Sequence, residues 1–186
     1  NNNNIAVINE FISLNNLDNY NSCLELGPQT WVAGNLTSLV VTYVQGGNSG
    51  ITQKISEIPE NIGQLTELSY LAIDKHNIIT LPVSFTQLSS LTLLKISNNW
   101  LTTLPEDFGN LINLNTLDLG YNQLESIPES TRDSPRSIAS TSLRYGMSAF
   151  AMHLASSGGT AFPIWIVTSS VEPLVVPSLG VASHLT

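Results

Sequence analysis

Cysteine, positive charge and long apolar runs are all scarce in this chain of 186 residues. The single cysteine, Cys23, excludes an intrachain disulfide framework and a multi-cysteine metal site, and we interpret it as a buried, inert thiol in preference to a reactive one. Six Lys and Arg against 14 Asp and Glu give a formal net charge of -8, which disfavours nucleic acid and anionic membrane surfaces as partners. No uninterrupted apolar run approaches the ~18 residues that a membrane helix requires.

Charged residues of both signs make up only 11% of the chain, so Asn, Ser and Thr supply most of its polarity. One domain with tails is expected at this length. The sequence begins without an initiator Met and without the basic and apolar segments of a signal peptide. It is therefore compatible with a processed or excised fragment, and the missing leader says little about compartment.

A repeat with a 23-residue step organises the middle of the chain, and its clearest unit runs from Leu88 to Leu111. The aligned apolar sets are Leu65, Leu88 and Leu111; Leu68, Leu91 and Leu114; Leu71, Leu94 and Leu117; Ile73, Ile96 and Leu119; Ile55, Ile78, Leu101 and Leu124; and Ile58, Leu81, Leu104 and Ile127. Each member of the last set directly precedes a proline. So many coincidences at one period predict a repeat architecture, in which each unit buries its core against its neighbours.

Each unit combines three local signals. Alternating segments such as LTLLKIS predict a half-buried strand. Asn99 or Asn122 then follows, with a side chain suited to bonding the backbone of a tight bend. The Leu-Pro corner ends the extended path, and a short helix or turn should then place Phe108, Phe85 and Ile62 inward.

These motifs resemble the leucine-rich repeat family, in the variant whose units read LxxLxLxxNxLxxLPxxFGxL; about 80 residues fit the pattern well. The resemblance implies an α/β solenoid, a short right-handed horseshoe with a parallel β-sheet on its concave side and helical or irregular segments on its convex side. With an N-terminal helical cap and an irregular C-terminal segment, this is the fold class that we expect. Extracellular members of the family often carry disulfide-rich caps, so the lone cysteine slightly favours an intracellular setting, while a secreted or cell-surface one stays open.

Three regions are expected: an N-terminal cap over 1–35, the repeats over 36–130, and a C-terminal cap or poorly ordered tail over 131–186. In the cap, Ile5, Ile8 and Ile12 keep helical spacing behind an Asn-rich, solvated start. Leu36, Leu39 and Val41 match the strand positions of a degenerate first repeat, and a nine-residue insertion at about 42–52 interrupts the register, because Val41 to Ile55 spans 14 positions where Ile73 to Ile78 spans five. After Ser130 the pattern stops.

No catalytic constellation is recognisable, so we expect a non-enzymatic chain without cofactor or metal site. His76 stands at the position of Asn99 and Asn122, and we interpret it as a replacement bend residue. An acid–base pair of His76 with Asp74 is the less favoured alternative, because His76 should turn inward.

The strand residues between the buried leucines should face the concave surface and form a binding site for a protein or peptide. The predicted site residues are Tyr70, Asp74, Lys75, Leu93, Lys95, Asn98, Thr116, Asp118 and Tyr121, with Ala72 between Tyr70 and Asp74 in the same face. Lys95 and Asp118 should be neighbours and can form a solvated pair. Alternatives are carbohydrate binding or a passive spacer in a larger surface protein, and association through an uncapped solenoid end.

Overall fold

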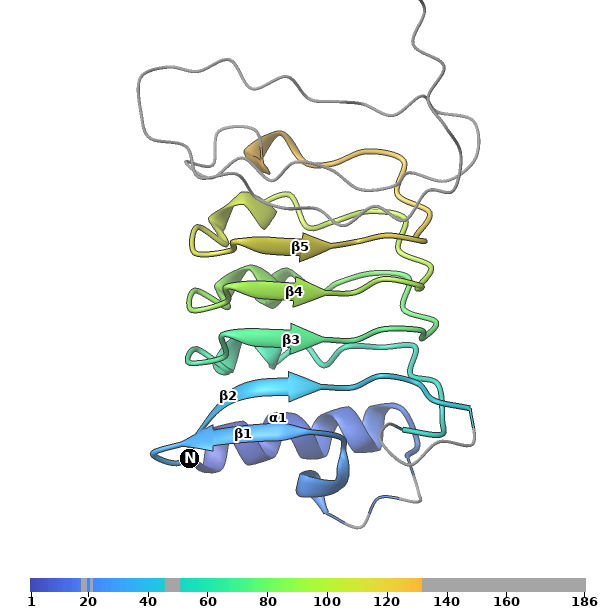
Figure 1. Ribbon diagram of the computed structural model, residues 1–186. Coiled ribbons are helices and arrows are strands. Elements are labelled where there is room, and N and C mark those ends of the chain that lie inside the picture. The colour runs from blue at the N-terminus through green and yellow to red at the C-terminus, as the bar shows by residue number, and fades with distance from the viewer. Residues whose placement is uncertain (18–19, 21, 46–50, 132–186) are drawn as a thin grey trace, which may run out of the picture.

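The computed structural model describes residues 1–17, 20, 22–45 and 51–131. Its helix is α1 (Asn2–Leu14), and its strands are β1 (Gln29–Val32), β2 (Asn35–Val40), β3 (Tyr70–Ala72), β4 (Leu93–Lys95) and β5 (Thr116–Asp118). Short 3-10 helices are η1 (Cys23–Glu25), η2 (Ile62–Gln64), η3 (Val83–Gln87), η4 (Phe108–Asn110) and η5 (Glu129–Thr131). The strands form a single five-stranded sheet in chain order (Figure 1).

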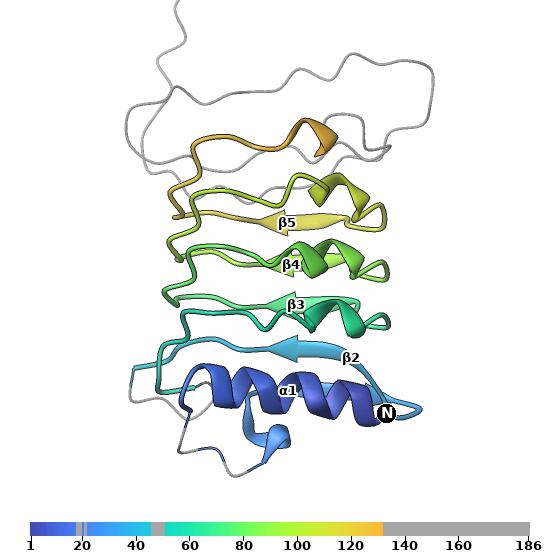
Figure 2. The same cartoon turned by 180° about the vertical axis from the view of Figure 1, so that it is seen from behind.

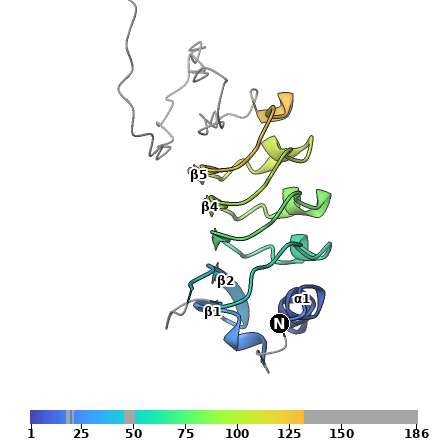
Figure 3. The same cartoon turned by 90° about the vertical axis from the view of Figure 1, so that its right-hand side faces the viewer.

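The coils stack as a solenoid, with strands on one side and 3-10 helices on the other. β2 to β5 pair in parallel, and the register places Leu71, Leu94 and Leu117 opposite one another. A parallel strand needs a crossover, and here each crossover runs through one of the 3-10 helices behind the sheet (Figure 2). The side view separates the two layers clearly, with α1 on the side of the 3-10 helices (Figure 3). The expected parallel leucine-rich solenoid is confirmed.

A continuous apolar core fills the space between the layers, from Val7 in α1 to Leu124 after β5. The strand leucines and the inward residues of the 3-10 helices, Ile62, Phe85 and Phe108, are almost fully buried, as the repeat pattern predicted. Each such side chain contributes about 1.5–3 kcal/mol through burial. Since every coil packs on the next one, the core grows serially.

The helix α1 begins and ends on asparagine side chains. Asn1 caps it by accepting a hydrogen bond from the amide of Asn3 (3.1 Å). Asn15 follows its last turn and bonds the next coil, accepting from the amides of Ser56 (2.9 Å) and Glu57 (3.1 Å). The expected helical cap is therefore present.

Two details of the cap differ from the sequence prediction. The core face of α1 is formed by Val7, Ile8 and Phe11, whereas Ile5 is 39% exposed, so the buried face is rotated from the expected one. The Asn-rich start is also not merely solvated. Asn4 is 3% exposed, and its Oδ1 accepts a hydrogen bond from the Leu36 amide (2.9 Å).

A hairpin between β1 and β2 completes the cap, and the sequence had not predicted it. β1 pairs antiparallel with β2 through a tight turn at Ala33 and Gly34, both with positive φ (49° and 79°), as the twist of a two-residue hairpin requires. β2 is the expected strand of the degenerate first repeat, with Leu39 opposite Leu71. β1 thus covers the edge that β2 would otherwise expose.

The two irregular regions lie partly or wholly outside the described residues. At the two ends of the predicted insertion at 42–52, the Val44 amide donates to the Ile51 carbonyl (3.0 Å) and the Ile51 amide donates to the Thr42 carbonyl (3.0 Å). Residues 46–50 of the insertion lie outside the described residues. Of the predicted C-terminal segment 131–186, only Thr131 is described.

Candidate partner-binding surface

The outer face of the sheet brings the predicted site residues together in rows across the coils. Tyr70, Leu93 and Thr116 are register partners, and all three are half-buried. The next outward row consists of Ala72, Lys95 and Asp118. Ala72 is only 3% exposed, so it contributes little surface, contrary to the sequence prediction. Its small side chain sits between the larger residues of β2 and β4.

A third row follows the strands and consists of Lys75, Asn98 and Tyr121. These residues share one position of the repeat, and all three have left-handed backbone, with φ of 66°, 53° and 55°. This conformation makes the bend that leaves each strand, and it turns the three side chains outward, where they are exposed. Asn tolerates this conformation best among the three, because its short polar side chain can hydrogen-bond to the local backbone.

The two predicted aspartates also have structural partners. Asp74 Oδ1 accepts hydrogen bonds from the amide and the hydroxyl of Ser97, both at 2.9 Å, and so ties one bend to the next. Asp118 Oδ1 accepts from the Gly120 amide (3.0 Å). Lys95 and Asp118 are neighbours in register, but over the described ranges they form no salt bridge. The two side chains of the predicted pair are therefore neighbours without an ion pair, and the Lys95 ammonium can bind solvent or a partner.

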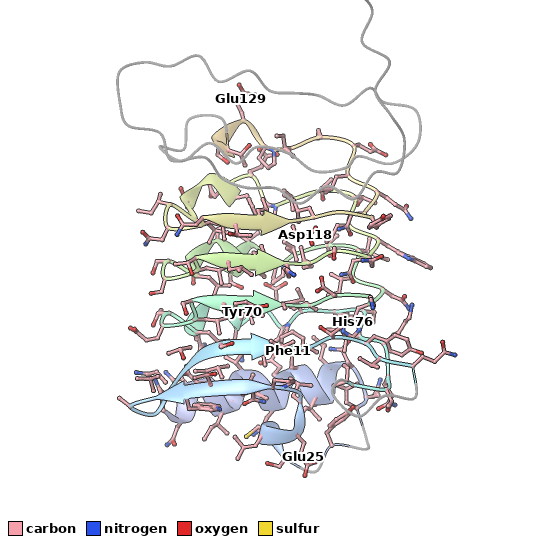
Figure 4. The ribbon with its side chains drawn as sticks, viewed as in Figure 1. Phe11, Glu25, Tyr70, His76, Asp118 and Glu129 are labelled. Atoms are coloured by element: carbon pink, nitrogen blue, oxygen red, sulfur yellow. The ribbon has the colours of Figure 1, made fainter. Side chains whose placement is uncertain are left out.

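Charges on this face cancel locally, although the chain as a whole is acidic. Asp74 and Asp118 are matched there by Lys75 and Lys95. Acidic residues elsewhere in the coils lie at the corners and on the 3-10 side, namely Glu57, Glu60, Glu67, Glu106, Asp107, Glu125 and Glu129. The formal charges of these four residues on the face therefore sum to zero. Figure 4 shows Tyr70 on β3 and Asp118 at the end of β5 on this side of the molecule.

Buried behind the bends, His76, Asn99 and Asn122 form a ladder of side chains that bond the backbone of the preceding coil. Asn99 donates to the Ile73 carbonyl (2.8 Å) and accepts from the Ile78 amide (3.2 Å). Asn122 repeats this pattern one coil on, with the Ile96 carbonyl (2.9 Å) and the Leu101 amide (3.0 Å).

His76 reproduces both bonds with its imidazole. Its Nδ1 accepts from the Ile55 amide (3.2 Å), so the ring proton resides on Nε2, which donates to the Val41 carbonyl (2.9 Å). The interpretation as a bend residue is confirmed. Because both ring nitrogens are engaged with backbone, His76 does not bond Asp74, and the acid–base pair does not form.

Burial lowers the pKa of His76 to about 4. The cost of desolvating an imidazolium is the main cause, and the positive charge of Lys54 adds to it, while the bond to the Val41 carbonyl acts in the opposite direction. Tyr43 packs edge-on to the ring at 6.4 Å, with Lys54 Nζ 5.3 Å from the Tyr43 ring centre. His76 is therefore a neutral structural group at physiological pH.

One exposed residue escaped the sequence prediction. Trp100 follows the ladder residue Asn99 and is 53% exposed, beside Tyr121 at 52%. A shallow hollow of about 250 Å³ is lined by Asn98, Asn99, Trp100, Tyr121 and Gln123. The available signal was an aromatic residue between two inward positions of the repeat, Asn99 and Leu101.

Neither a metal cluster nor a membrane-spanning helix occurs in the described residues. No group of three or more His, Cys, Asp or Glu is placed to hold a metal ion there. Within the same ranges, no helix has the length and apolar character to span a bilayer. Cys23 is partly buried against the core as a free thiol, so it is less enclosed than the sequence suggested.

The stacked coils, parallel sheet and asparagine ladder define a leucine-rich repeat solenoid. Residues 66–124 match the family model described as Leucine rich repeat, so this part of the chain is similar to leucine-rich repeat proteins. Domains of this family generally mediate protein–protein interactions and are typically non-enzymatic. A comparison with curated proteins found no match.

The solved structures that are similar to this chain include one from a bacterium and two from plants. A leucine-rich repeat protein of Leptospira interrogans is 31% identical, over 59% of this chain and 25% of its own length, with a TM-score of 0.48. A plant ice-binding protein is 22% identical, over 73% of this chain and 46% of its own, with a TM-score of 0.56. The ectodomain of the receptor kinase SOBIR1 from Arabidopsis thaliana is 17% identical, over 68% of this chain and 83% of its own length, with a TM-score of 0.48. The chain thus spans a quarter to under half of the first two relatives.

Proposed function

We propose that this chain is a non-catalytic binding module that recognises another protein or a peptide on the concave face of its sheet. The observation that carries the proposal is the alignment of Tyr70, Leu93 and Thr116 with the rows Lys95–Asp118 and Lys75–Asn98–Tyr121. The strands β3 and β4 are hydrogen-bonded to a neighbouring strand on each side, and β5 is hydrogen-bonded to β4. Binding would therefore cost little ordering of the surface.

The composition of the face indicates the kind of partner. Its central row combines an aromatic, an aliphatic and a hydroxyl side chain, which supply contact area, and its flanking charges sum to zero. A strongly basic partner would be attracted elsewhere, toward the acidic corners and 3-10 side. We therefore infer a partner surface that is close to neutral, with a carboxylate or carbonyl placed to accept from Lys95.

The test is affinity capture from an extract of the source organism, followed by mass spectrometry and measurement of binding with the recombinant partner. The triple variant Tyr70→Ala, Leu93→Ala, Lys95→Ala should lose the partner, because it removes the centre of the face and leaves the buried leucines intact. Its matched control is Val83→Ala, Glu106→Ala, Ile112→Ala, three exposed residues outside the face.

The proposal predicts loss with the first triple variant and full recovery with the control. Equal recovery by both, with native circular dichroism, would refute it and favour a passive spacer. Loss with the control alone would move the partner site to the 3-10 side.

A further inference from the structure

The hollow beside Trp100 is distinct from the centre of the concave face. It lies where the chain leaves β4 and β5, and it is formed by residues of two successive coils: Asn98, Asn99 and Trp100 from one, Tyr121 and Gln123 from the next. The residues that flank Trp100 in sequence point inward, with Asn99 3% and Leu101 0% exposed. Trp100 therefore lies at the surface between two inward-pointing residues, with 53% of the residue exposed to solvent.

The second aromatic residue of the hollow is held there against a backbone preference. Tyr121 adopts φ 55°, a left-handed conformation that costs a non-glycine residue roughly 1–2 kcal/mol. Glycine would relieve this strain at the same bend. Both aromatic rings are about half exposed at this hollow, so both can contact a ligand there.

The polar groups of the hollow are uncharged. Asn99 uses its amide in the ladder, with the Ile73 carbonyl and the Ile78 amide. Gln123 differs, because its side-chain amide has no hydrogen-bond partner within the described part of the chain. Asn98 has one contact, from its Nδ2 to the Ser97 hydroxyl at 3.3 Å. Two amide side chains remain that can both donate to and accept from a ligand.

We propose that this hollow binds a neutral sugar, with the pyranose ring stacked on Trp100 and flanked by Tyr121. The electron-rich face of an aromatic ring attracts the polarised C–H groups on the apolar face of a pyranose. The amides of Asn98 and Gln123 match hydroxyl groups, which also donate and accept. None of the described residues that line the hollow is charged, which disfavours phosphate, sulfate and uronic acid groups.

Size selects a sugar over an extended peptide. The hollow, at about 250 Å³, falls below the ~300–1,000 Å³ of sites that enclose a drug-sized ligand. It accommodates one ring or the end of an oligosaccharide, whereas a peptide would need a groove along several coils. This proposal does not rest on protein recognition by the concave face, although the two surfaces meet at Asn98 and Tyr121.

The experiment titrates the whole chain with soluble neutral tetrasaccharides of glucose, mannose, galactose and N-acetylglucosamine, followed by tryptophan fluorescence and calorimetry. At least one should bind saturably, and Trp100→Ala should weaken that affinity by about tenfold or more, whereas Trp100→Phe keeps a stacking surface and should retain most of it. Gln123→Ala should weaken binding by about fivefold. Ile112→Ala, an equally exposed apolar residue at 53%, is the control and should bind normally.

Several results would overturn the proposal. These are no saturable binding by any of the four sugars, equal affinity of wild type and Trp100→Ala, or stronger binding of a neutral tetrapeptide than of every sugar. The concave-face triple variant Tyr70→Ala, Leu93→Ala, Lys95→Ala leaves the hollow intact and should still bind the sugar. Failure of one proposal is therefore distinguishable from failure of the other.

Discussion

Acidification from pH 7 to pH 4 should destabilise the solenoid through His76. At neutral pH the ring accepts from the Ile55 amide at Nδ1 and donates to the Val41 carbonyl from Nε2. A proton added to Nδ1 would oppose the Ile55 N–H, a second donor, in a site where the ring is only 1% exposed. The native state therefore resists protonation, whereas the unfolded chain does not.

The size and sign of the effect follow from the two pKa values. In the folded protein the pKa of His76 is about 4, against an ordinary 6.5 for the unfolded chain. Between these values the unfolded state binds more protons, so the free energy of unfolding falls as pH decreases from 6.5 to 4. The loss between pH 7 and pH 4 is about 3 kcal/mol for this one group, a large fraction of the ~5–15 kcal/mol that stabilises a typical domain.

Urea unfolding followed by far-ultraviolet circular dichroism, at half-unit steps from pH 7 to pH 4, measures the effect. His76→Asn is the matched variant, because Asn99 and Asn122 already make the same two bonds at the same repeat position. Carboxylates titrate equally in both proteins, so the difference between wild type and variant isolates His76. That difference should change by about 3 kcal/mol across the window in favour of the variant.

Parallel stability curves for the two proteins would refute this reasoning, as would an imidazole pKa near 6.5 measured for His76 by NMR. His76→Ala provides a second check. It leaves the Ile55 amide and the Val41 carbonyl buried without this partner, and should cost about 2–5 kcal/mol at pH 7.

Two further predictions concern the cap and the bends. Asn4→Ala should lower the free energy of unfolding by about 1–3 kcal/mol, because the Leu36 amide loses its buried acceptor. Asn3 is exposed, so Asn3→Ala is the control and should change the free energy of unfolding little. Equal effects of the two substitutions in urea unfolding would contradict the role of Asn4. Lys75→Gly should raise the free energy of unfolding by about 1 kcal/mol, because glycine adopts the left-handed backbone conformation without strain. Lys75→Ala keeps the strain and should not raise it. A higher unfolding temperature for the alanine variant alone would argue against backbone strain at this position.

The repeat core could be predicted from local spacing. Leu71, Leu94 and Leu117 recur at a period of 23 residues, within segments that alternate as strands do. Such a repeat buries its apolar residues when equivalent positions of successive units stack on one another. The parallel pairing of the strands and the inward direction of the leucines could therefore be predicted. The role of His76 was predictable for the same reason, since its phase matched that of Asn99 and Asn122.

The N-terminal cap depended on contacts that no period encodes. Whether Ile5 or Val7 faces the core is decided by how α1 packs on the first coils, because both choices keep helical spacing. The use of Asn4 to satisfy the Leu36 amide joins positions 32 residues apart, and polar composition alone does not distinguish a buried acceptor from a solvated one.

The outer face of the sheet was likewise predicted only in part from the sequence. The sequence by itself determined which residues alternate with the leucines, and so the rows that contain Tyr70, Leu93 and Lys95. Only the tertiary structure decided which of them reach solvent, and it placed Trp100 beside Tyr121 at the edge of the face. The reason is physical: alternation assigns a side of the sheet, whereas exposure depends on the volume of neighbours in adjacent coils and on the bend geometry that directs each side chain.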